Sequence, residues 1–471
     1  MAKDKEDARE LLLKVVRQTW GRGFYHLRYW RGDFWEWESS EWEGKGTAYH
    51  RITEVEVGGC FQKALVKLGY LITSPHQVGD LIKIAQREFL IPDSKDMPVM
   101  IEEHDQYKPY PGFVAFHDGI MNTSFLGRVV EGSNMQDHTP LWFSDQCLDF
   151  SYSSKATYPK WDKFLEEVLP DPELQKLLQM WFGYTLFHDT SQQKFLLVVG
   201  PAATGKSVMA KIMGKLAGPG GVSAIPLKDF GKPFSLYQTL GRKINIDPDM
   251  SELDKVDEGI LRSYVGGDLM KVERKYKDPI MVYPSARLVF CTNDLPHIAD
   301  RSNATWRRMI LLPFDQVVPV EKRNPHLVEE LSKELSGIWN WAWEGLQELQ
   351  RQGRFLEPKR MQEAIAEYKT EVSPVRQWLE EKCKVGADHW IRCTQAYALF
   401  VSYISARGYK TPSQKSFGRS LAAAVGETMT REGTVIRKQR RIGGLVKWYY
   451  HGLYVEPEDP QDIIVKVTEN R

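Results

Sequence analysis

A glycine-rich loop near the middle of the chain constrains its fold more than any other segment. Residues 194–199 have the composition of a buried strand, and residues 208–216 have helical spacing. The loop between them consists of Gly200, Pro201, Ala202, Ala203, Thr204, Gly205, Lys206 and Ser207. A glycine-rich loop in this context can curl so that its backbone N–H groups point at phosphate oxygens. The sequence therefore predicts a phosphate-binding loop inside an α/β fold.

The residue types in this loop indicate the cofactors. The start of the following helix adds a partial positive charge. Lys206 can reach the β and γ phosphates of a nucleotide, and the Ser207 hydroxyl can ligate Mg²⁺. We therefore expect ATP and Mg²⁺ as cofactors. The alternative is a chance glycine-rich turn, which the complete motif and its strand–loop–helix setting disfavour.

Acidic residues follow a second strand-like segment, residues 243–249. A nucleotide hydrolase needs an acid to hold Mg²⁺ through water and to orient the attacking water. Asp249 and Asp247 are the candidates, with Glu252 as an outside choice. Acids after a strand can also belong to a solvated turn. Their position after the phosphate loop is what favours a catalytic role.

Two further polar signals come later in the chain. Residues 287–293 end a strand on Asn293, whose amide could polarise the hydrolytic water. Arg307 and Arg308 precede another apolar strand. Arginine matches phosphate geometry and stabilises charge in phosphoryl transfer. A turn-forming asparagine and surface ion pairs would explain the same residues without catalysis.

Composition limits the possible partners and location. The 471 residues suffice for about three domains. The formal net charge is only +1, so nucleic acid would have to be bound by local basic patches. The five cysteines are scattered, the N-terminus is charged, and the longest aliphatic run, residues 195–199, is too short to span a bilayer. We expect a cytoplasmic chain with no membrane partner.

Two segments outside the loop region could contact nucleic acid. Residues 25–37 predict an aromatic hairpin turning at Gly32-Asp33, whose rings could stack on bases but more simply form the core of a small sheet. Residues 394–406 and 413–425 predict helices before a basic hairpin. That order suggests a winged-helix module, with a solvated charged turn as the alternative. The basic residues of this hairpin are Arg437, Lys438, Arg440, Arg441 and Lys447.

In their order and spacing, these motifs resemble those of superfamily 3 helicases, especially the phage and plasmid primase-helicases related to the poxvirus helicase-primase. The resemblance is specific over about residues 191–314 and weaker through residues 23–42 and 337–346. The segments that carry it are the loop 200–207, Asn-Ile-Asp-Pro-Asp at 245–249, Gly-Gly-Asp at 266–268 before Glu-Arg-Lys-Tyr-Lys at 273–277, Phe-Cys-Thr-Asn at 290–293, and Trp-Arg-Arg at 306–308.

The resemblance implies an AAA+-type ATPase that forms a hexameric ring and threads one DNA strand through its pore. Single-stranded and forked DNA would be its substrates, in replication of a phage, plasmid or other mobile element. By position, Asn293 is the sensor and Arg308 reaches the neighbouring subunit's site, with Arg307 in reserve. Lys275 and Tyr276 fall on the pore hairpin that grips the DNA backbone, flanked by Arg274 and Lys277.

Two departures from the family pattern stand out. Many relatives have Glu at the position of Asp249, which leaves the division of labour between Asp247 and Asp249 open. Residues 1–150 lack a convincing Asp-x-Asp arrangement for a primase, so we expect primer synthesis to reside in a separate primase or polymerase. The alternatives are an ATP-gated DNA-binding switch or loader that does not unwind processively, and a DNA-binding accessory whose ATP site is only structural.

The expected architecture is an AAA+-like P-loop ATPase core with an α+β N-terminal domain and a C-terminal winged-helix-like domain. Its expected parts are an accessory domain at 1–150, a helical lead-in at 151–190, the ATPase helicase core at 191–316, a helical lid at 317–372, and the winged-helix-like domain with a polar tail at 373–471.

Overall fold

The computed structural model describes most of the chain. The described residues are 7–21, 24–38, 48–70, 75–102, 106–108, 112–123, 135–250, 257–275, 277–293, 295, 304–371, 373–407, 411–428, 436–442 and 445–455. Of the sequence predictions, Glu252, Tyr276 and the tail after residue 455 lie outside this part of the chain. Arg440 is described only as part of a strand.

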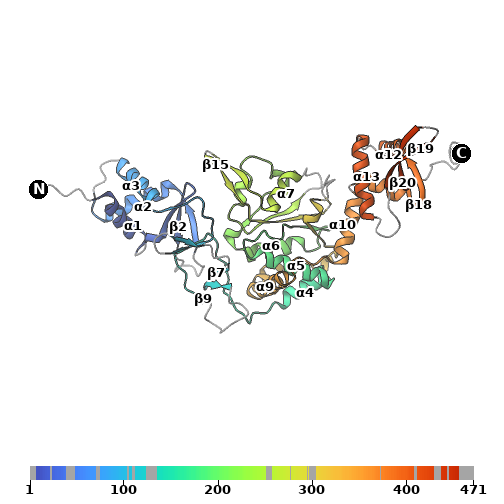
Figure 1. Cartoon of the computed structure of the whole chain (residues 1–471). Coiled ribbons are helices and arrows are strands. Elements are labelled where there is room, and N and C mark those ends of the chain that lie inside the picture. The colour runs from blue at the N-terminus through green and yellow to red at the C-terminus, as the bar shows by residue number, and fades with distance from the viewer. Residues whose placement is uncertain are drawn as a thin grey trace.

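Three helices and a small sheet form the N-terminal unit (Figure 1). The sheet has the order β3-β2-β1-β4. Its members are α1 (Ala8–Trp20), α2 (Glu54–Lys67), α3 (Pro75–Glu88), β1 (Leu27–Trp30), β2 (Asp33–Glu38), β3 (Ala48–Ile52) and β4 (Leu90–Ile91). The predicted hairpin is confirmed, but its turn is Arg31-Gly32, one residue earlier than expected. Trp30 and Phe34 are buried, so these two rings pack in the interior as the simpler interpretation predicted.

Short strands connect this unit to the centre of the molecule. One sheet has the order β10-β5-β6 and another the order β7-β8-β9. Their bounds are β5 (Val99–Glu102), β6 (Gln106–Lys108), β7 (Phe113–Phe116), β8 (Gly119–Asn122), β9 (Met135–Gln136) and β10 (Trp142–Phe143). Asp145 follows β10 and pairs with Arg242 of the central unit at 2.8 Å. An ion pair therefore holds this stretch of chain against the central unit.

The centre is a five-stranded parallel sheet in the order β12-β13-β16-β11-β17. The strands are β11 (Phe195–Val199), β12 (Val222–Ser223), β13 (Ile244–Met250), β16 (Arg287–Thr292) and β17 (Met309–Pro313). The middle three strands of this order are nearly all buried, because helices cover parallel sheets on both faces. Since parallel strands share direction, all their carboxyl ends reach one edge of the sheet.

Helices surround this sheet, and two of them pack backbone to backbone. They are α4 (Pro159–Val168), α5 (Pro172–Thr185), α6 (Lys206–Ala217), α7 (Glu258–Gly266), α8 (Leu327–Ser332), α9 (Leu335–Gln352) and α10 (Lys359–Glu371). A side chain at Gly183 of α5 would meet the backbone nitrogen of Leu346 at 2.3 Å, and one at Gly345 of α9 would meet the carbonyl of Gln179 at 2.1 Å. Glycine at both positions permits this close approach. An antiparallel hairpin, β14 (Met270–Arg274) and β15 (Lys277–Val282), follows α7.

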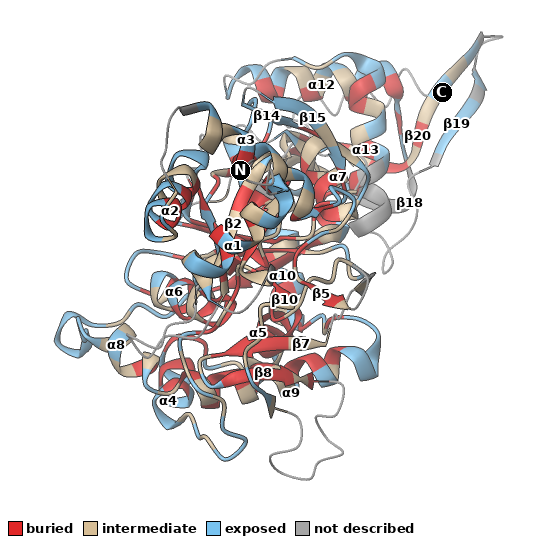
Figure 2. Ribbon diagram, turned by 90° about the vertical axis from the view of Figure 1, so that its left-hand side faces the viewer, coloured by how far each residue is buried: buried red, intermediate tan, exposed pale blue. Residues whose placement is uncertain are grey.

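The C-terminal unit has its own hydrophobic cluster, centred on Trp378, Phe400, Phe417 and Leu453. Its elements are α11 (Pro374–Lys382), α12 (Cys393–Ser405), α13 (Gln414–Thr428), β18 (Cys383–Arg392), β19 (Ile436–Ile442) and β20 (Leu445–Val455), with sheet order β18-β20-β19. In Figure 2 the β19–β20 hairpin extends away from the helices. The expected mixture of helices and strands is confirmed. No helix in the described ranges combines the length and the apolar composition needed to cross a bilayer.

Candidate nucleotide site and nucleic-acid surfaces

The glycine-rich loop joins β11 to α6 at the carboxyl edge of the sheet. Gly205 adopts a left-handed conformation with φ 91°, and a side chain there would meet Val168 at 2.9 Å. A side chain at Gly200 would meet the carbonyl oxygen of Phe314 at 2.0 Å. No side chain caps α6, so its first N–H groups are left for another acceptor. Strand, loop and helix together form an anion-binding geometry.

Lys206 connects this loop to the neighbouring strand. Its ammonium donates to the carbonyl oxygens of Gly200 at 2.5 Å and Pro201 at 2.8 Å, and to Asn293 Oδ1 at 3.1 Å. Burial lowers the pKa of Lys206, and the charge of Asp249 acts in the opposite direction. The structure thus brings together three residues that the sequence predicted for one site: Lys206, Asn293 and Asp249. Ser207 follows in the first turn of α6 and is exposed.

The two candidate acids have different surroundings. Asp247 is buried, and its Oδ2 accepts a hydrogen bond of 3.2 Å from the backbone N–H of Leu227. Asp249 is exposed and acts electrostatically on Lys206. A register shift in β13 between Asp247 and Met250 breaks the strand's alternation. The environment therefore favours Asp249 as the acid available to a metal, and a supporting role for Asp247.

The arginine pair lies at the other edge of the sheet. The short helix η7 (Trp306–Arg308) leads into β17, whose first residue pairs with the first residue of β11. The Arg308 guanidinium donates to the carbonyl of Ala304 at 3.0 Å. Arg307 is exposed, and its carbonyl accepts from Lys194 at 2.6 Å. Because a strand of this length spans roughly 15 Å, Arg308 is remote from the loop of its own chain.

The predicted pore hairpin is present as β14–β15, and two of its cations contact the N-terminal unit. Arg274 donates to the carbonyl of Arg31 at 3.2 Å. Lys277 donates to the carbonyl of Gly32 at 2.9 Å and pairs with Asp33 at 3.1 Å. Lys275 occupies the turn, next to Tyr276. The β1–β2 turn therefore contacts the tip of a hairpin that the sequence predicted to contact DNA.

The C-terminal hairpin combines cations with exposed aromatic rings. Arg437, Lys438 and Arg441 are all exposed in β19. The Arg437 guanidinium lies 4.4 Å from the centre of the Trp448 ring. Trp448 is 43% exposed, and Trp390 of β18 is 41% exposed. From the sequence we predicted only the cations of this surface and missed Trp448 and Trp390. The alternation of aromatic and basic residues in β20 was the signal that could have identified Trp448.

Comparisons with known proteins point to viral helicases. Residues 16–170 match the family described as D5 N terminal like, and residues 198–308 match a family of unknown function, DUF5906. Over 212 residues the chain is 22% identical to a putative helicase L207/L206 of Acanthamoeba polyphaga mimivirus, covering 43% of this chain and 21% of that protein. It is also 22% identical to a putative helicase 022R of Frog virus 3, covering 52% and 27% of the two chains.

A third relative is the putative helicase 184R of Invertebrate iridescent virus 6, 28% identical over 32% of this chain and 17% of its own length. The chain thus spans about a sixth to a quarter of the length of the viral relatives it matches. Among solved structures, the apo NrS-1 C terminal region (305-718) has a TM-score of 0.49 and 11% identity, over 96% of this chain and all of the other. The A form apo structure of the same region has a TM-score of 0.48. All three viral relatives are named putative helicases, and their identity to this chain is low.

The different surroundings of the two acids give a prediction. Asp249→Asn should lower ATP hydrolysis by about 10²-fold or more, as loss of a catalytic acid does, while leaving thermal stability unchanged. Asp247→Asn should instead destabilise the protein by about 1–3 kcal/mol, because it weakens a buried charge-assisted hydrogen bond. Phosphate release and thermal unfolding, measured on both variants, separate the two effects. Equal loss of turnover with equal stability in both variants would contradict this division.

Proposed function

We propose that this chain is an ATP-dependent DNA helicase of the superfamily 3 type. It forms a hexameric ring that moves along single-stranded DNA during replication of a virus, plasmid or other mobile element. The observation that carries this proposal is the contact between Lys206 of the phosphate loop and Asn293 of the adjacent strand. A lysine and a polar sensor meeting at the carboxyl edge of a parallel sheet is the arrangement that γ-phosphate hydrolysis requires.

In this proposal the residues of the site divide the chemistry as follows. The loop N–H groups and Lys206 hold the phosphates, and Ser207 with Asp249 holds Mg²⁺, whose charge would neutralise the phosphate oxygens. Lys206 exchanges its contacts with the Gly200 and Pro201 carbonyls for phosphate oxygens. Asn293 would orient the attacking water, and Asp249 would hold the metal beside it.

The same proposal assigns the parts of the chain. Residues 191–316 form an AAA+-like ATPase core, because the loop-bearing strand β11 lies between β16 and β17 in a parallel sheet. Residues 1–150 are an accessory domain, 151–190 a helical lead-in to the core, 317–372 a helical lid, and 373–471 a winged-helix-like domain with a polar tail. Helices α11, α12 and α13 with the three-stranded sheet support the last assignment. A separate primase or polymerase would supply primers.

DNA would be held at two places. The β14–β15 hairpin would grip the strand in the ring's pore through Arg274, Lys275, Tyr276 and Lys277. The β19–β20 hairpin would bind DNA outside the pore, with Arg437, Lys438, Arg440 and Arg441 contacting phosphates. Exposed Trp448 beside Arg437 supports this second surface, since bases stack on aromatic side chains at about 1–3 kcal/mol each.

One observation favours a second candidate function, an ATP-gated DNA-binding switch or loader. The contacts of Arg274 and Lys277 with the β1–β2 turn reduce the freedom of the hairpin to engage DNA. In that version the release of the turn, and not processive translocation, would be the output of ATP hydrolysis. Processive unwinding of a long duplex separates the helicase from the switch.

The first test concerns the motor itself. Lys206→Ala should reduce ATP hydrolysis by about 10²- to 10³-fold, because it removes a cation that stabilises transition-state charge. Unwinding of a forked duplex should be lost with it. Lys211→Ala, which removes an exposed lysine one turn further along α6, is the control. Circular dichroism checks the fold of both variants. Near-wild-type turnover by folded Lys206→Ala protein would remove the ATPase assignment.

The second test concerns Arg308, which lies remote from its own loop. We expect Arg308→Ala subunits to bind nucleotide but not to hydrolyse it, since the arginine would act in a neighbour's site. Mixing them with Lys206→Ala subunits should restore part of the turnover, because some interfaces then combine an intact lysine with an intact arginine. The measurement is phosphate release across a mixing series, with mixed assembly verified by tagged subunits. Mixed rings without recovery would contradict action across the interface.

The third test concerns the contact between Lys277 and Asp33. Asp33→Asn weakens this pair and should raise affinity for a labelled single-stranded oligonucleotide about two- to five-fold, the effect of a surface ion pair. Asp80→Asn makes the same charge change on α3, away from this contact, and is the matched control. Fluorescence anisotropy at several salt concentrations measures both. An equal gain in the two variants would mean that net charge alone, and not the turn, governs binding.

A further inference from the structure

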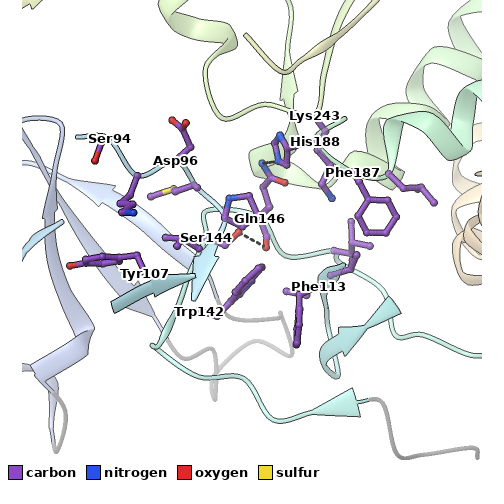
Figure 3. Close-up of a pocket in the computed structure, with 18 residues that line it drawn as sticks. Ser94, Asp96, Tyr107, Phe113, Trp142, Ser144, Gln146, Phe187, His188 and Lys243 are labelled. Atoms are coloured by element: carbon purple, nitrogen blue, oxygen red, sulfur yellow. Dashed lines mark hydrogen bonds between the residues drawn. The ribbon is translucent and has the colours of Figure 1, made fainter. Parts of the chain in front are cut away.

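A cavity of about 450 Å³ lies between the N-terminal strands and the central unit, away from the phosphate loop. Figure 3 shows its lining: Lys243, His188 and Gln146 from one side, and Trp142, Phe113 and Tyr107 among the rings of the other walls. Lys243 directly precedes β13, at the amino edge of the sheet. The phosphate loop follows the carboxyl end of β11, so the cavity and the loop occupy opposite edges.

Lys243 is the feature that needs explanation. Its side chain is only 7% exposed and lines the cavity. Within the described part of the chain its ammonium makes no hydrogen bond or ion pair. Burial, together with the charge of nearby Arg287, lowers the pKa of Lys243 to about 8, while the charge of Asp145 acts in the opposite direction. Because a buried ammonium without a partner is costly, something with negative charge would stabilise it.

The surroundings of Lys243 contain more positive than negative charge. Arg287 is buried, and its guanidinium donates to the carbonyls of Asp189 and Ser285 but to no carboxylate in the described residues. Asp145 is already paired with Arg242 at 2.8 Å. Burial lowers the pKa of His188 well below its usual value, so the imidazole is neutral and adds no charge to the site. Asp145 also attracts Lys243, so among the described residues one buried carboxylate is shared between Lys243 and Arg242, and positive charge remains in excess at this end of the cavity.

The other walls are aromatic. Trp142 is buried, and its ring lies 5.9 Å from that of Phe113, tilted by 41°. The Trp142 indole N–H is enclosed and has no hydrogen-bond acceptor. Phe187 lines the cavity near Lys243 in Figure 3. Cavities of this size with apolar and aromatic walls and a few convergent polar groups are typical of small-molecule sites.

We propose that this cavity binds a nucleoside monophosphate, with its phosphate at Lys243 and its base between the aromatic walls near Trp142. A ligand of this class supplies a negative charge beside Lys243 and a flat ring for the aromatic side. The same chemistry is found in a free nucleotide and in one nucleotide of a DNA strand. The site is distinct from the ATP site and does not depend on hydrolysis there.

The test uses the full chain with its phosphate loop saturated by a non-hydrolysable ATP analogue and Mg²⁺. Calorimetric titration with dAMP should then reveal one additional site per chain. Lys243→Met should weaken dAMP binding about tenfold or more, as loss of a charged hydrogen bond does. Lys163→Met, an exposed lysine of α4, should leave it unchanged. Adenosine and inorganic phosphate, titrated separately, should each bind at least about tenfold more weakly than dAMP.

Thermal unfolding, competition and binding measurements distinguish the possible outcomes. Lys243→Met should unfold at or above the wild-type temperature, because it replaces a buried unpaired charge by an apolar chain. Trp142→Phe provides a second variant, which keeps a ring but reduces the aromatic surface available to the base. Displacement of dAMP by a single-stranded oligonucleotide would identify a DNA strand as the source, and no displacement would identify a free nucleotide; both support the site. Absence of an additional site in the wild type, or dAMP binding unaffected in both Lys243→Met and Trp142→Phe, overturns the proposal.

Discussion

The parallel pairing of β11 with β16 is the constraint on which the candidate site depends. It puts the loop after Val199 and the end of β16 side by side, so that Lys206 and Asn293, distant in sequence, meet at 3.1 Å. Glycine at positions 200 and 205 is needed for the loop to pass Phe314 and Val168 closely enough. Helices α5 and α9 pack through Gly183 and Gly345 and support the sheet from one side. The approaches at Gly183, Gly200 and Gly345 are to backbone atoms, that at Gly205 is to side chains, and none of the four positions would tolerate a larger residue without displacement.

The sequence predicted the loop well because its chemistry is local. Strand, glycine turn, lysine and helix follow one another directly, and each has a strong spacing signal. The roles of Asp247 and Asp249 were not predictable, because a register shift in β13 decides which carboxylate is buried. The prediction placed the turn of the first hairpin one residue too late. Arg31 adopts a positive φ, which sequence rules assign to glycine or asparagine. Long-range contacts such as Lys277 with Asp33 leave no local signal at all.

The N-terminal unit is more closely joined to the centre than a separate accessory domain need be. Its β1–β2 turn holds Arg274 and Lys277, Asp145 pairs with Arg242, and the cavity at Lys243 lies between the two units. Any movement between the units would change all three. A ligand in the cavity would stabilise one relative position and thereby influence the hairpin, because a ligand shifts an equilibrium toward the state it binds better. The DNA-facing and ligand-facing surfaces would then be coupled through a shared motion, without a direct contact between them.

The position of Arg308 has a consequence for assembly. One end of the β11–β17 pair carries the phosphate loop, and the other end carries the arginine. Since Arg308 is remote from its own loop, in the proposed ATPase it would complete a neighbour's site and not the site of its own chain. An arginine contributes much of the charge stabilisation in phosphoryl transfer, so on that proposal a single chain should hydrolyse ATP slowly. Head-to-tail association would complete every site at once, because repeated heterologous contacts close into a ring. Turnover that rises with protein concentration is therefore an intrinsic expectation of this arrangement.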